Sequence, residues 1–409
     1  MTSGTTTAAV ASDGSARELR TLVVVSAVHL VSHYYWLVFA PMMPALHDLL
    51  NVSYTEIGFA ITVMNGVSAL TQAPTGFIVD RYGPRLLLFI GVLIGSAGFM
   101  MIGAAPTYPM LLAGAVLIGL GNAVYHPADY SILSAEMRPA RMGRAYSIHS
   151  FTGYIGFAIA PPLVMALIWI DGVRFALVAT GLIGIILALP LLPDIPAEQR
   201  GLKERRANPA KAQTSARSLI TPGVIALTIM FTTLNMSTGL VQTYMMVALE
   251  QLFSLPLAVG NTALTVFLSL LVGGIIIGGF IADGVKHQST IAALGLTAAA
   301  LLFIVIGAVN LGQTGTLVMA GAAGLLAGVI VPSRDLLVRQ ASPPDAVGRV
   351  FGIVTTGFNF GGMVSPIVGG MLVDHQAPAW IFYVSAAFML LTVVIAVVVD
   401  RSEKLALKL

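Results

Sequence analysis

The sequence predicts an all-α polytopic membrane protein with twelve transmembrane helices in two pseudo-symmetric six-helix bundles. Of its 409 residues, 57% are hydrophobic and only 10% are charged, whereas about a quarter of the residues of a soluble domain are charged. Apolar runs of roughly twenty residues recur along the whole chain, which is the length of helix that crosses a bilayer core. These runs do not alternate as the strands of a membrane barrel do.

The third observation is an internal repeat. Pro127 aligns with Pro332 and Asp129 with Arg334, each pair 205 positions apart. The stretch 76–80 likewise resembles the stretch 279–283. Two halves with the same in-out sense are related by an axis along the membrane normal, and the substrate site of such a protein lies between them near the midplane.

The first half begins with residues 1–19, which are rich in Thr, Ser and Ala and are expected to form a disordered cytoplasmic tail. The N-terminal six-helix bundle occupies residues 20–192. Its first span covers residues 20–46, and Ser53 and Glu56 have the spacing of a capping box that starts the second. Four further spans are expected near 86–105, 109–135, 144–170 and 173–192.

Residues 193–219 interrupt this pattern because they are polar, charged and proline-containing, so they are expected to form the cytoplasmic linker between the bundles. The C-terminal bundle occupies residues 220–400 and a short tail covers 401–409. Its six spans are expected near 220–250, 257–282, 289–309, 315–339, 348–373 and 379–399.

The distribution of basic residues predicts the orientation. Of the 21 Lys and Arg residues, all but Arg174 and Arg334 lie in the tails, the linker or the turns on the same side as the linker. Because segments rich in Lys and Arg stay in the cytoplasm, both termini and the linker are expected there, in a bacterial inner membrane. The basic pI thus reflects topology, and no nucleic acid is expected as a partner.

Composition also limits the chemistry. The chain has no cysteine, which excludes disulfides and thiolate metal sites. It has no Gly-x-x-x-x-Gly-Lys-Ser/Thr loop for ATP, and no feature indicates an enzyme or a cofactor. Transport would therefore draw its energy from an ion gradient.

The turn after the second span carries a resemblance. It contains Gly76, Asp80, Arg81, Gly83 and Arg85, and it is similar to the signature turn between helices two and three of the major facilitator superfamily. The resemblance covers roughly residues 20–400 and implies the twelve-helix fold of that superfamily, with Pro84 standing where a basic residue is usual.

Two further stretches resemble the fosmidomycin-resistance branch of this superfamily. They are His29-Leu30-Val31-Ser32-His33 in the first span and the segment 119–127, GLGNAVYHP, in the fourth. The resemblance implies a membrane carrier of small solutes, with protons, the solute and the lipid bilayer as its partners and with a monomeric chain.

Asp129 is an ionisable residue inside the fourth span, where charge is costly and normally faces a cavity or a partner. Its repeat mate Arg334 is the expected partner across a central cavity, in a bridge that gates or couples transport. Bracing of the cytoplasmic turn and direct contact with substrate are the alternatives for Asp129. Arg334 is also a candidate to bind an anionic substrate, unless it only pairs with Asp129 while Asp335 pairs with Arg339.

Histidines are the other candidates for coupling. His29 and His33 are four residues apart and share a helix face, and His126 lies in the fourth span. Histidine exchanges protons near neutral pH, which suits proton coupling or hydrogen bonding to substrate. A structural role and, less expected, a metal site remain open, and no metal is assigned.

The cavity wall is predicted from polar residues inside the spans. The seventh span is unusually polar and contributes Thr232, Asn235 and Gln242. We expect these groups to line a wet cavity or to hydrogen-bond between helices. The predicted substrate set is His29, His33, Tyr34, Tyr125, His126, Thr232, Asn235, Gln242 and Arg334, with Asp129, His126, His33 and Arg334 for coupling or gating. Asn65, Ser68, Gln72, His149 and Asn359 are further candidates for the lining.

The leading hypothesis is a proton-coupled, alternating-access carrier that exports a drug or metabolite by proton antiport. The alternative is a proton symporter that takes up a small organic anion. A metal-ion exporter and a membrane sensor that has lost transport are the remaining possibilities.

Overall fold

The computed structural model describes residues 4–138, 141–200, 220–284, 288–343 and 347–406. Over these residues the secondary structure is helical and no strand occurs, so the predicted all-α class is confirmed. The first half contains α1 (Gly4–Leu37), α2 (Phe39–Leu50), α3 (Tyr54–Tyr82), α4 (Pro84–Ala104), α5 (Tyr108–Glu136), α6 (Met142–Ala188) and the 3₁₀ helix η2 (Leu189–Asp194). The second half contains α8 (Pro222–Phe253), α9 (Leu257–Gly284), α10 (Gln288–Ala308), α11 (Gly312–Gln340), α12 (Val347–Asp374) and α13 (Ala379–Ala406).

The helices make the twelve predicted crossings. Eight of the described helices are long and apolar enough to span a membrane, and α1 with α2 forms a further span that bends by 40°. Helix α6 holds two crossings, because its backbone leaves the helical region at Asp171 and Gly172. Gly172 has a φ of 74°, which glycine adopts at no steric cost. The more polar α3 and the helix α10 complete the set.

The N-terminal tail differs from the prediction. Helix α1 begins at Gly4 and includes most of residues 1–19, which the sequence analysis assigned to a disordered segment. Extending an existing helix costs far less than starting one, and ion pairs hold the emerging turns. Glu18 lies 2.7 Å from Arg138 and 3.1 Å from Arg141. Of the C-terminal tail 401–409, residues up to Ala406 continue α13, and the last three lie outside the described residues.

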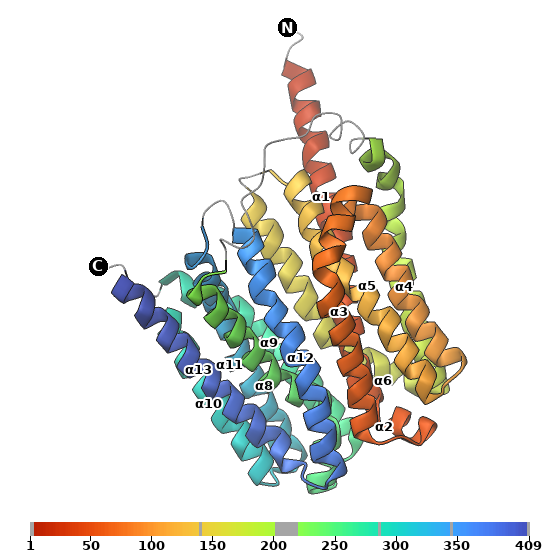
Figure 1. Cartoon of the computed structure of the whole chain (residues 1–409), viewed down its shortest axis with the longest axis vertical. Helices are drawn as coiled ribbons and strands as arrows, with labels where there is room; N and C mark the ends of the chain where they lie inside the picture. Colours follow the sequence, from red (N-terminus) through yellow and green to blue (C-terminus); the bar gives the residue numbers. More distant parts are fainter. Residues whose placement is uncertain (1–3, 139–140, 201–219, 285–287, 344–346, 407–409) are drawn as a thin grey trace.

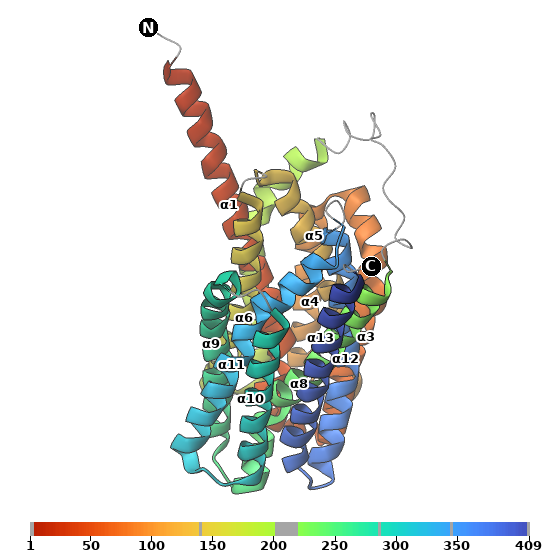
Figure 2. The same ribbon diagram turned by 90° about the vertical axis from the view of Figure 1, so that its left-hand side faces the viewer.

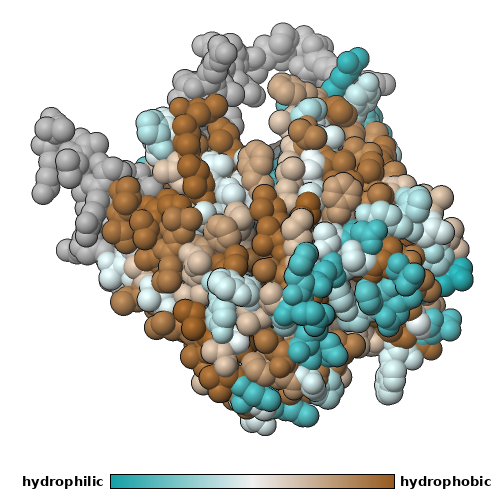
Figure 3. Space-filling model, turned by 60° about the horizontal axis from the view of Figure 1, so that its bottom comes forward, coloured by the Kyte–Doolittle hydropathy of each residue, from teal (hydrophilic) through white to brown (hydrophobic). Residues whose placement is uncertain are grey.

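The two halves lie side by side with their helices roughly parallel (Figures 1 and 2). Both chain ends lie toward one face, which we call the terminal face, and the short connections around residues 51–53 and 375–378 mark the opposite face. Figure 3 shows the broad hydrophobic flanks of the molecule, with hydrophilic residues gathered toward the opposite face. Side chains such as Trp169, Leu70 and Phe280 are more than three-quarters exposed, as expected of a surface that meets lipid.

The hydrophobic core is shared by the halves at one end only. One cluster joins residues of both halves, including Phe39 and Met42 of α2 and Leu240 and Tyr244 of α8. Toward the terminal face, a second cluster contains only first-half residues and a third contains only second-half residues. The halves are therefore packed together toward the opposite face and have separate cores toward the terminal face.

An acidic residue fastens the two halves at the opposite face. The carboxylate of Asp374, at the end of α12, accepts hydrogen bonds from the backbone amides of Tyr54 and Thr55 at 3.0 and 2.8 Å and from the Thr55 hydroxyl at 2.6 Å. The start of α3 also has its own cap, because Ser53 and Glu56 form the predicted capping box. A carboxylate at a helix N-terminus satisfies free amides and the positive end of the dipole.

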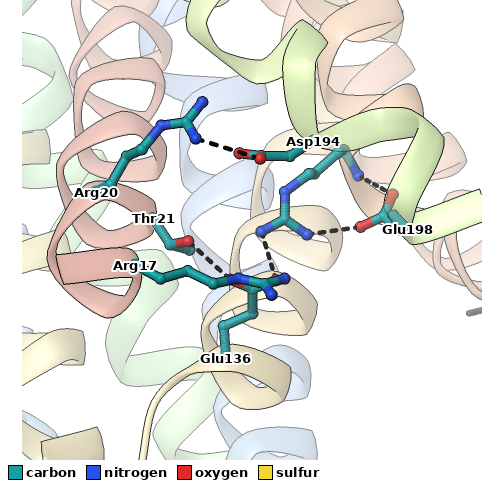
Figure 4. A network of polar contacts seen from close by, with 7 residues as sticks. Arg17, Arg20, Thr21, Glu136, Asp194 and Glu198 are labelled. Carbon is teal, nitrogen blue, oxygen red and sulfur yellow. Dashed lines mark hydrogen bonds and ion pairs between the residues drawn. The ribbon is translucent and has the colours of Figure 1, made fainter. Parts of the chain in front are cut away.

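Glu136, the last residue of α5, is the centre of a polar network on the terminal face (Figure 4). It lies 3.0 Å from Arg17 of α1 and 2.8 Å from Arg85 of α4, and it accepts a 2.8 Å hydrogen bond from Thr21. Figure 4 also shows Arg20 pointing to Asp194 of η2. This network ties the ends of several first-half helices to one carboxylate.

The linker begins later than predicted. Residues 195–200 are helical, and Glu198 accepts hydrogen bonds from both the backbone amide and the side chain of Arg85, at 2.9 and 3.1 Å. Asp194 and Glu198, within the predicted linker, are thus paired with Arg20 and Arg85 of the N-terminal bundle. The part of the linker at 201–219 lies outside the described residues.

In the signature turn, Gly83 has a φ of 97° between α3 and α4, and Pro84 starts α4. Arg81 lies over the Tyr82 ring, with its guanidinium carbon 5.4 Å from the ring centre. Asp80 is exposed. Nothing lies within 4 Å of the place where a Cβ on Gly76 would stand, so Gly76 does not mark a close helix contact here.

We predict that Asp374→Ala opens the cavity to the opposite face. Hydrogen bonds to a charged group contribute about 1.5–3 kcal/mol, and losing three of them shifts the balance between conformations by roughly tenfold or more. Because the chain has no cysteine, Thr243→Cys provides a single label on the cavity wall. Its reaction with a membrane-impermeant thiol reagent added at the opposite face should accelerate by that factor.

The matched control is Asp171→Ala, which removes an exposed acid from the same face without touching the contact between α3 and α12. It should leave the labelling rate unchanged. Equal rates for Asp374→Ala and the parent protein would contradict the role of Asp374.

Candidate functional site

A cavity of about 240 Å³ lies between the two halves. Its wall is formed by residues of α1, α2, α3, α5 and α6 on one side and of α8, α9, α11 and α12 on the other. Apolar and aromatic side chains such as Trp36 and Phe157 alternate with amides such as Asn65 and Asn359. A mostly apolar pocket with few polar groups is typical of small-molecule sites.

The structure places six of the nine predicted substrate residues on this wall. His29, His33 and His126 lie on the first-half side, and Asn235, Gln242 and Arg334 lie on the second-half side. Of the further lining candidates, Asn65, Gln72 and Asn359 also lie on the wall. Asn359 donates a 3.0 Å hydrogen bond to Gln72 and so links α12 to α3.

Three predicted residues turn away from the cavity. The Tyr34 hydroxyl is hydrogen-bonded to Thr180 at 2.8 Å inside the first bundle. The Thr232 hydroxyl donates to the carbonyl of Thr228 at 2.9 Å. Tyr125 is only 2% exposed and borders a separate, much smaller cavity. Tyr34 and Tyr125 each follow or precede a cavity histidine directly, and adjacent residues on a helix point about 100° apart.

Asp129 is fully buried behind the first-half wall, among histidines. Its Oδ2 lies 3.2 Å from Nδ1 of His29 and 3.6 Å from Nε2 of His149. The rings of His29 and His149 are stacked, with centroids 3.8 Å apart, and those of His33 and His126 lie 4.6 and 5.4 Å from His29. Four imidazoles and one carboxylate thus form a continuous group, which we call the His–Asp cluster.

Several buried polar atoms of the His–Asp cluster lack hydrogen bonds within the described part of the chain. Both oxygens of Asp129, both ring nitrogens of His149 and the Nδ1 atoms of His29, His33 and His126 are buried and have no hydrogen-bond partner there. Polar atoms buried in this way cost several kcal/mol unless a further group compensates them. A proton placed between the carboxylate and a histidine provides that compensation.

The expected bridge between Asp129 and Arg334 does not form. Arg334 instead donates from Nε and Nη2 to Oδ1 of its neighbour Asp335, at 2.9 and 2.8 Å. The predicted pairing of Asp335 with Arg339 is also absent from the described contacts. Asp129 is buried within the first bundle, whereas Arg334 lines the cavity from the second, and the long arginine side chain reaches back to the next residue along the helix.

The central position of His149 was not predicted from the sequence, where it is only a candidate lining residue. His149 is fully buried. It lies seven residues after the start of α6 at 142, and Asp129 lies seven residues before the end of α5 at 136. Two consecutive helices that meet at a short turn bring such positions to the same depth, so this spacing was a usable signal.

A metal ion is geometrically conceivable, because ligand atoms of His29, Asp129 and His149 lie within 4.8 Å of one another. However, the His29 and His149 rings are stacked with an angle of 27° between their planes. Metal ligation needs the in-plane lone pairs of both imidazoles to converge on one point, and stacked rings direct them along neighbouring planes instead. This arrangement suits proton binding better.

Close helix packing holds the cluster together. A Cβ on Gly153 of α6 would lie 2.8 Å from Nε2 of His29 and 2.9 Å from Nε2 of His33. One turn later, a Cβ on Gly156 would overlap the carbonyl of Leu30. The glycines therefore let α6 approach α1 closely enough for the histidine rings to touch.

We predict that Gly153→Ala destabilises the protein by about 1–3 kcal/mol, the usual cost of overpacking, because the added methyl group would push the His29 and His33 rings out of their present contacts. The measurement is the thermal unfolding midpoint of the purified protein. Gly143→Ala in the same helix is the control, since no atom lies within 4 Å of its added methyl group, and it should unfold at the parent temperature or slightly higher. Equal midpoints for the two variants would contradict the packing argument.

Known proteins share this architecture. A bacterial homologue of the human lysosomal transporter Spinster superposes with a TM-score of 0.72 in its inward-facing, occupied form, covering 95% of this chain and 96% of that one at 15% identity. Its unoccupied form gives a TM-score of 0.75, covering 94% and 97%, also at 15% identity. These likenesses establish the fold.

Comparison with known sequences gives a match over nearly the full length of the chain and others over less than half of it. The fosmidomycin resistance protein of Escherichia coli is 24% identical over 94% of this chain and 93% of its own length. A probable L-galactonate transporter of Escherichia coli is 28% identical over a region that covers 35% of this chain and 32% of that protein. The oxalate:formate antiporter of Oxalobacter formigenes is 29% identical over 46% of this chain and 44% of its own length.

The family assignment rests on the whole chain. The profile of the Major Facilitator Superfamily matches residues 25–322 and 261–408. The helix count, the two related bundles and the central cavity agree with it. The chain belongs to the Major Facilitator Superfamily of membrane transporters.

Proposed function

We propose that this protein is a proton-coupled secondary transporter of the bacterial inner membrane, which exports a small organic solute in exchange for protons. The observation that carries the proposal is the His–Asp cluster. Its members Asp129, His29 and His149 are buried, both carboxylate oxygens and several ring nitrogens have no hydrogen-bond partner in the described chain, and the cluster reaches the cavity through His29, His33 and His126.

Charge distribution supports the orientation. Basic residues such as Arg17, Arg85 and Arg141 gather at the terminal face, while Arg174 alone among the described Lys and Arg residues lies toward the opposite face. Cytoplasmic segments carry this excess of basic residues. The terminal face is accordingly the cytoplasmic one, and the cavity lies between halves whose cores are separate on that side.

The transport cycle follows from this arrangement. A solute enters the cavity from the cytoplasm, and rocking of the halves closes the terminal face while the contact between Asp374 and α3 opens. A proton that enters from the opposite face then occupies Asp129 and its neighbour His29 or His149. Return to the present conformation releases the proton inside, so that the inward proton gradient drives outward solute movement.

Similarity to a fosmidomycin resistance protein over nearly the full length supports export. Uptake of a small organic anion by proton symport is the second candidate, because Arg334 lies on the cavity wall beside the rings of Phe231 and Phe358. The oxalate:formate antiporter among the relatives supports an anionic solute. The chain is expected to act as a monomer and without a cofactor.

We predict that Asp129→Asn abolishes gradient-driven transport but spares exchange of solute at equilibrium. The variant keeps the size of the side chain while removing its proton exchange. Purified protein in liposomes containing a pH-sensitive dye is exposed to fosmidomycin, oxalate, formate, L-galactonate and nitrate. A solute that moves protons with the parent protein should no longer move them with the variant.

The sign of the proton signal separates the two candidates, since antiport and symport move protons in opposite directions relative to the solute. Asp171→Asn, which changes an exposed acid in a connecting turn, is the matched control and should transport normally. Loss of both exchange and gradient-driven transport in Asp129→Asn, or of neither, would contradict proton coupling at Asp129.

A further inference from the structure

The charges on the cavity wall belong to one pair of neighbours. Among the described residues that line the cavity, Arg334 and Asp335 are the only Asp, Glu, Lys or Arg side chains. Arg334 is 8% exposed, and the Asp335 side chain is 39% exposed. Through these two residues the wall therefore presents one positive and one negative group side by side.

The guanidinium is held firmly in the wall. Its central carbon lies 4.6 Å from the ring centre of Phe231 and 5.4 Å from that of Phe358. Rings at this distance attract a cation and fix the plane of the guanidinium. Tyr154 of the first half lines the same cavity. A ligand that extends from Arg334 to Tyr154 would therefore touch both halves of the transporter.

The Asp335 carboxylate is only partly used by this pair. Both hydrogen bonds from Arg334 go to one oxygen, Oδ1, and no hydrogen bond to Oδ2 is found within the described chain. Tyr130 of the first half lines the same cavity as Asp335. The pair thus offers an acceptor oxygen beside a guanidinium at the same point of the wall.

This arrangement discriminates between ligand charges. A simple anion that displaced Asp335 from Arg334 would leave the carboxylate without its partner, and a simple cation on Asp335 would leave the guanidinium without its own. An unpaired charge away from bulk water is costly. A ligand that carries both charges replaces each partner of the pair and leaves neither group unpaired.

We propose that the substrate is a small zwitterion, whose acidic group binds Arg334 and whose ammonium group binds Asp335. This inference rests on the proposed transport function and specifies its substrate class. The aromatic and aliphatic side chains around the pair, such as Trp36 and Phe157, contact the uncharged part of the molecule. Asp335 is then a specificity-determining residue that excludes simple anions.

The test compares matched probes that differ only in charge. One set is L-phenylalanine, 3-phenylpropanoate and 2-phenylethylamine, and another is 4-aminobutanoate, butanoate and butylamine. Each is added to the purified protein, and the dissociation constant is obtained from the concentration dependence of thermal stabilisation. In at least one set, the zwitterion should bind at least about tenfold more tightly than its matched anion and its matched amine.

Variants assign the two charges. Asp335→Asn should weaken binding of the zwitterion and strengthen binding of the anion. The preference for the zwitterion, measured as the dissociation constant of the anion divided by that of the zwitterion, should fall at least about tenfold. Asp335→Ser provides a second variant if the first is unstable without ligand. Arg334→Gln should weaken the binding of both the zwitterion and the anion. Arg339→Gln, an exposed change on the same helix, should leave every dissociation constant unchanged.

Three results would overturn the proposal: equal binding of the zwitterion and its matched anion in both sets, an unchanged ratio in both Asp335 variants, or stabilisation by no zwitterion of the panel. Because these are equilibrium measurements, they are independent of proton coupling. Zwitterion selectivity without proton-driven transport would refute only the proposed function. Proton-driven transport of simple anions would refute only the proposal that the substrate is a zwitterion.

Discussion

Burial of the Asp129 carboxylate is the constraint on which the first bundle depends. A charged group inside a bilayer-spanning helix is tolerated only with a partner or a cavity, and here the partners are imidazoles of α1 and α6. To bring them together, α6 carries glycine where it crosses α1. The packing of three helices is therefore set by the need to surround one carboxylate with groups that can accept or release a proton.

Much of the fold was predictable because its signals are local or repeated. Hydropathy sets the spans, Ser53 and Glu56 set the start of α3, and the repeat sets the relation of the halves. The boundaries of the linker were less predictable, since its charge suggested solvent while Glu198 is in fact paired with Arg85. A charged residue in a sequence does not reveal whether the folded protein provides an oppositely charged partner for it.

The site was predicted in its residue types more than in its pairings. The polar wall and the histidines followed from polar residues inside apolar spans, but Tyr34, Tyr125 and Thr232 were misplaced because helix rotation about its axis is not visible in a weakly amphipathic sequence. The partners of Asp129 and Arg334 were wrong for a related reason. Repeat symmetry relates positions, but it does not determine which neighbour a long side chain reaches.

The core shared by the halves also bears on how the protein is made. The first bundle leaves the ribosome before the second exists, so those of its residues in that cluster that pack against the second half first face lipid. Lipid tails are as apolar as the side chains that replace them, so this exposure carries little hydrophobic penalty. Close packing and contacts such as that of Asp374 with α3 must then hold the halves together, since the hydrophobic effect contributes little between helices in lipid.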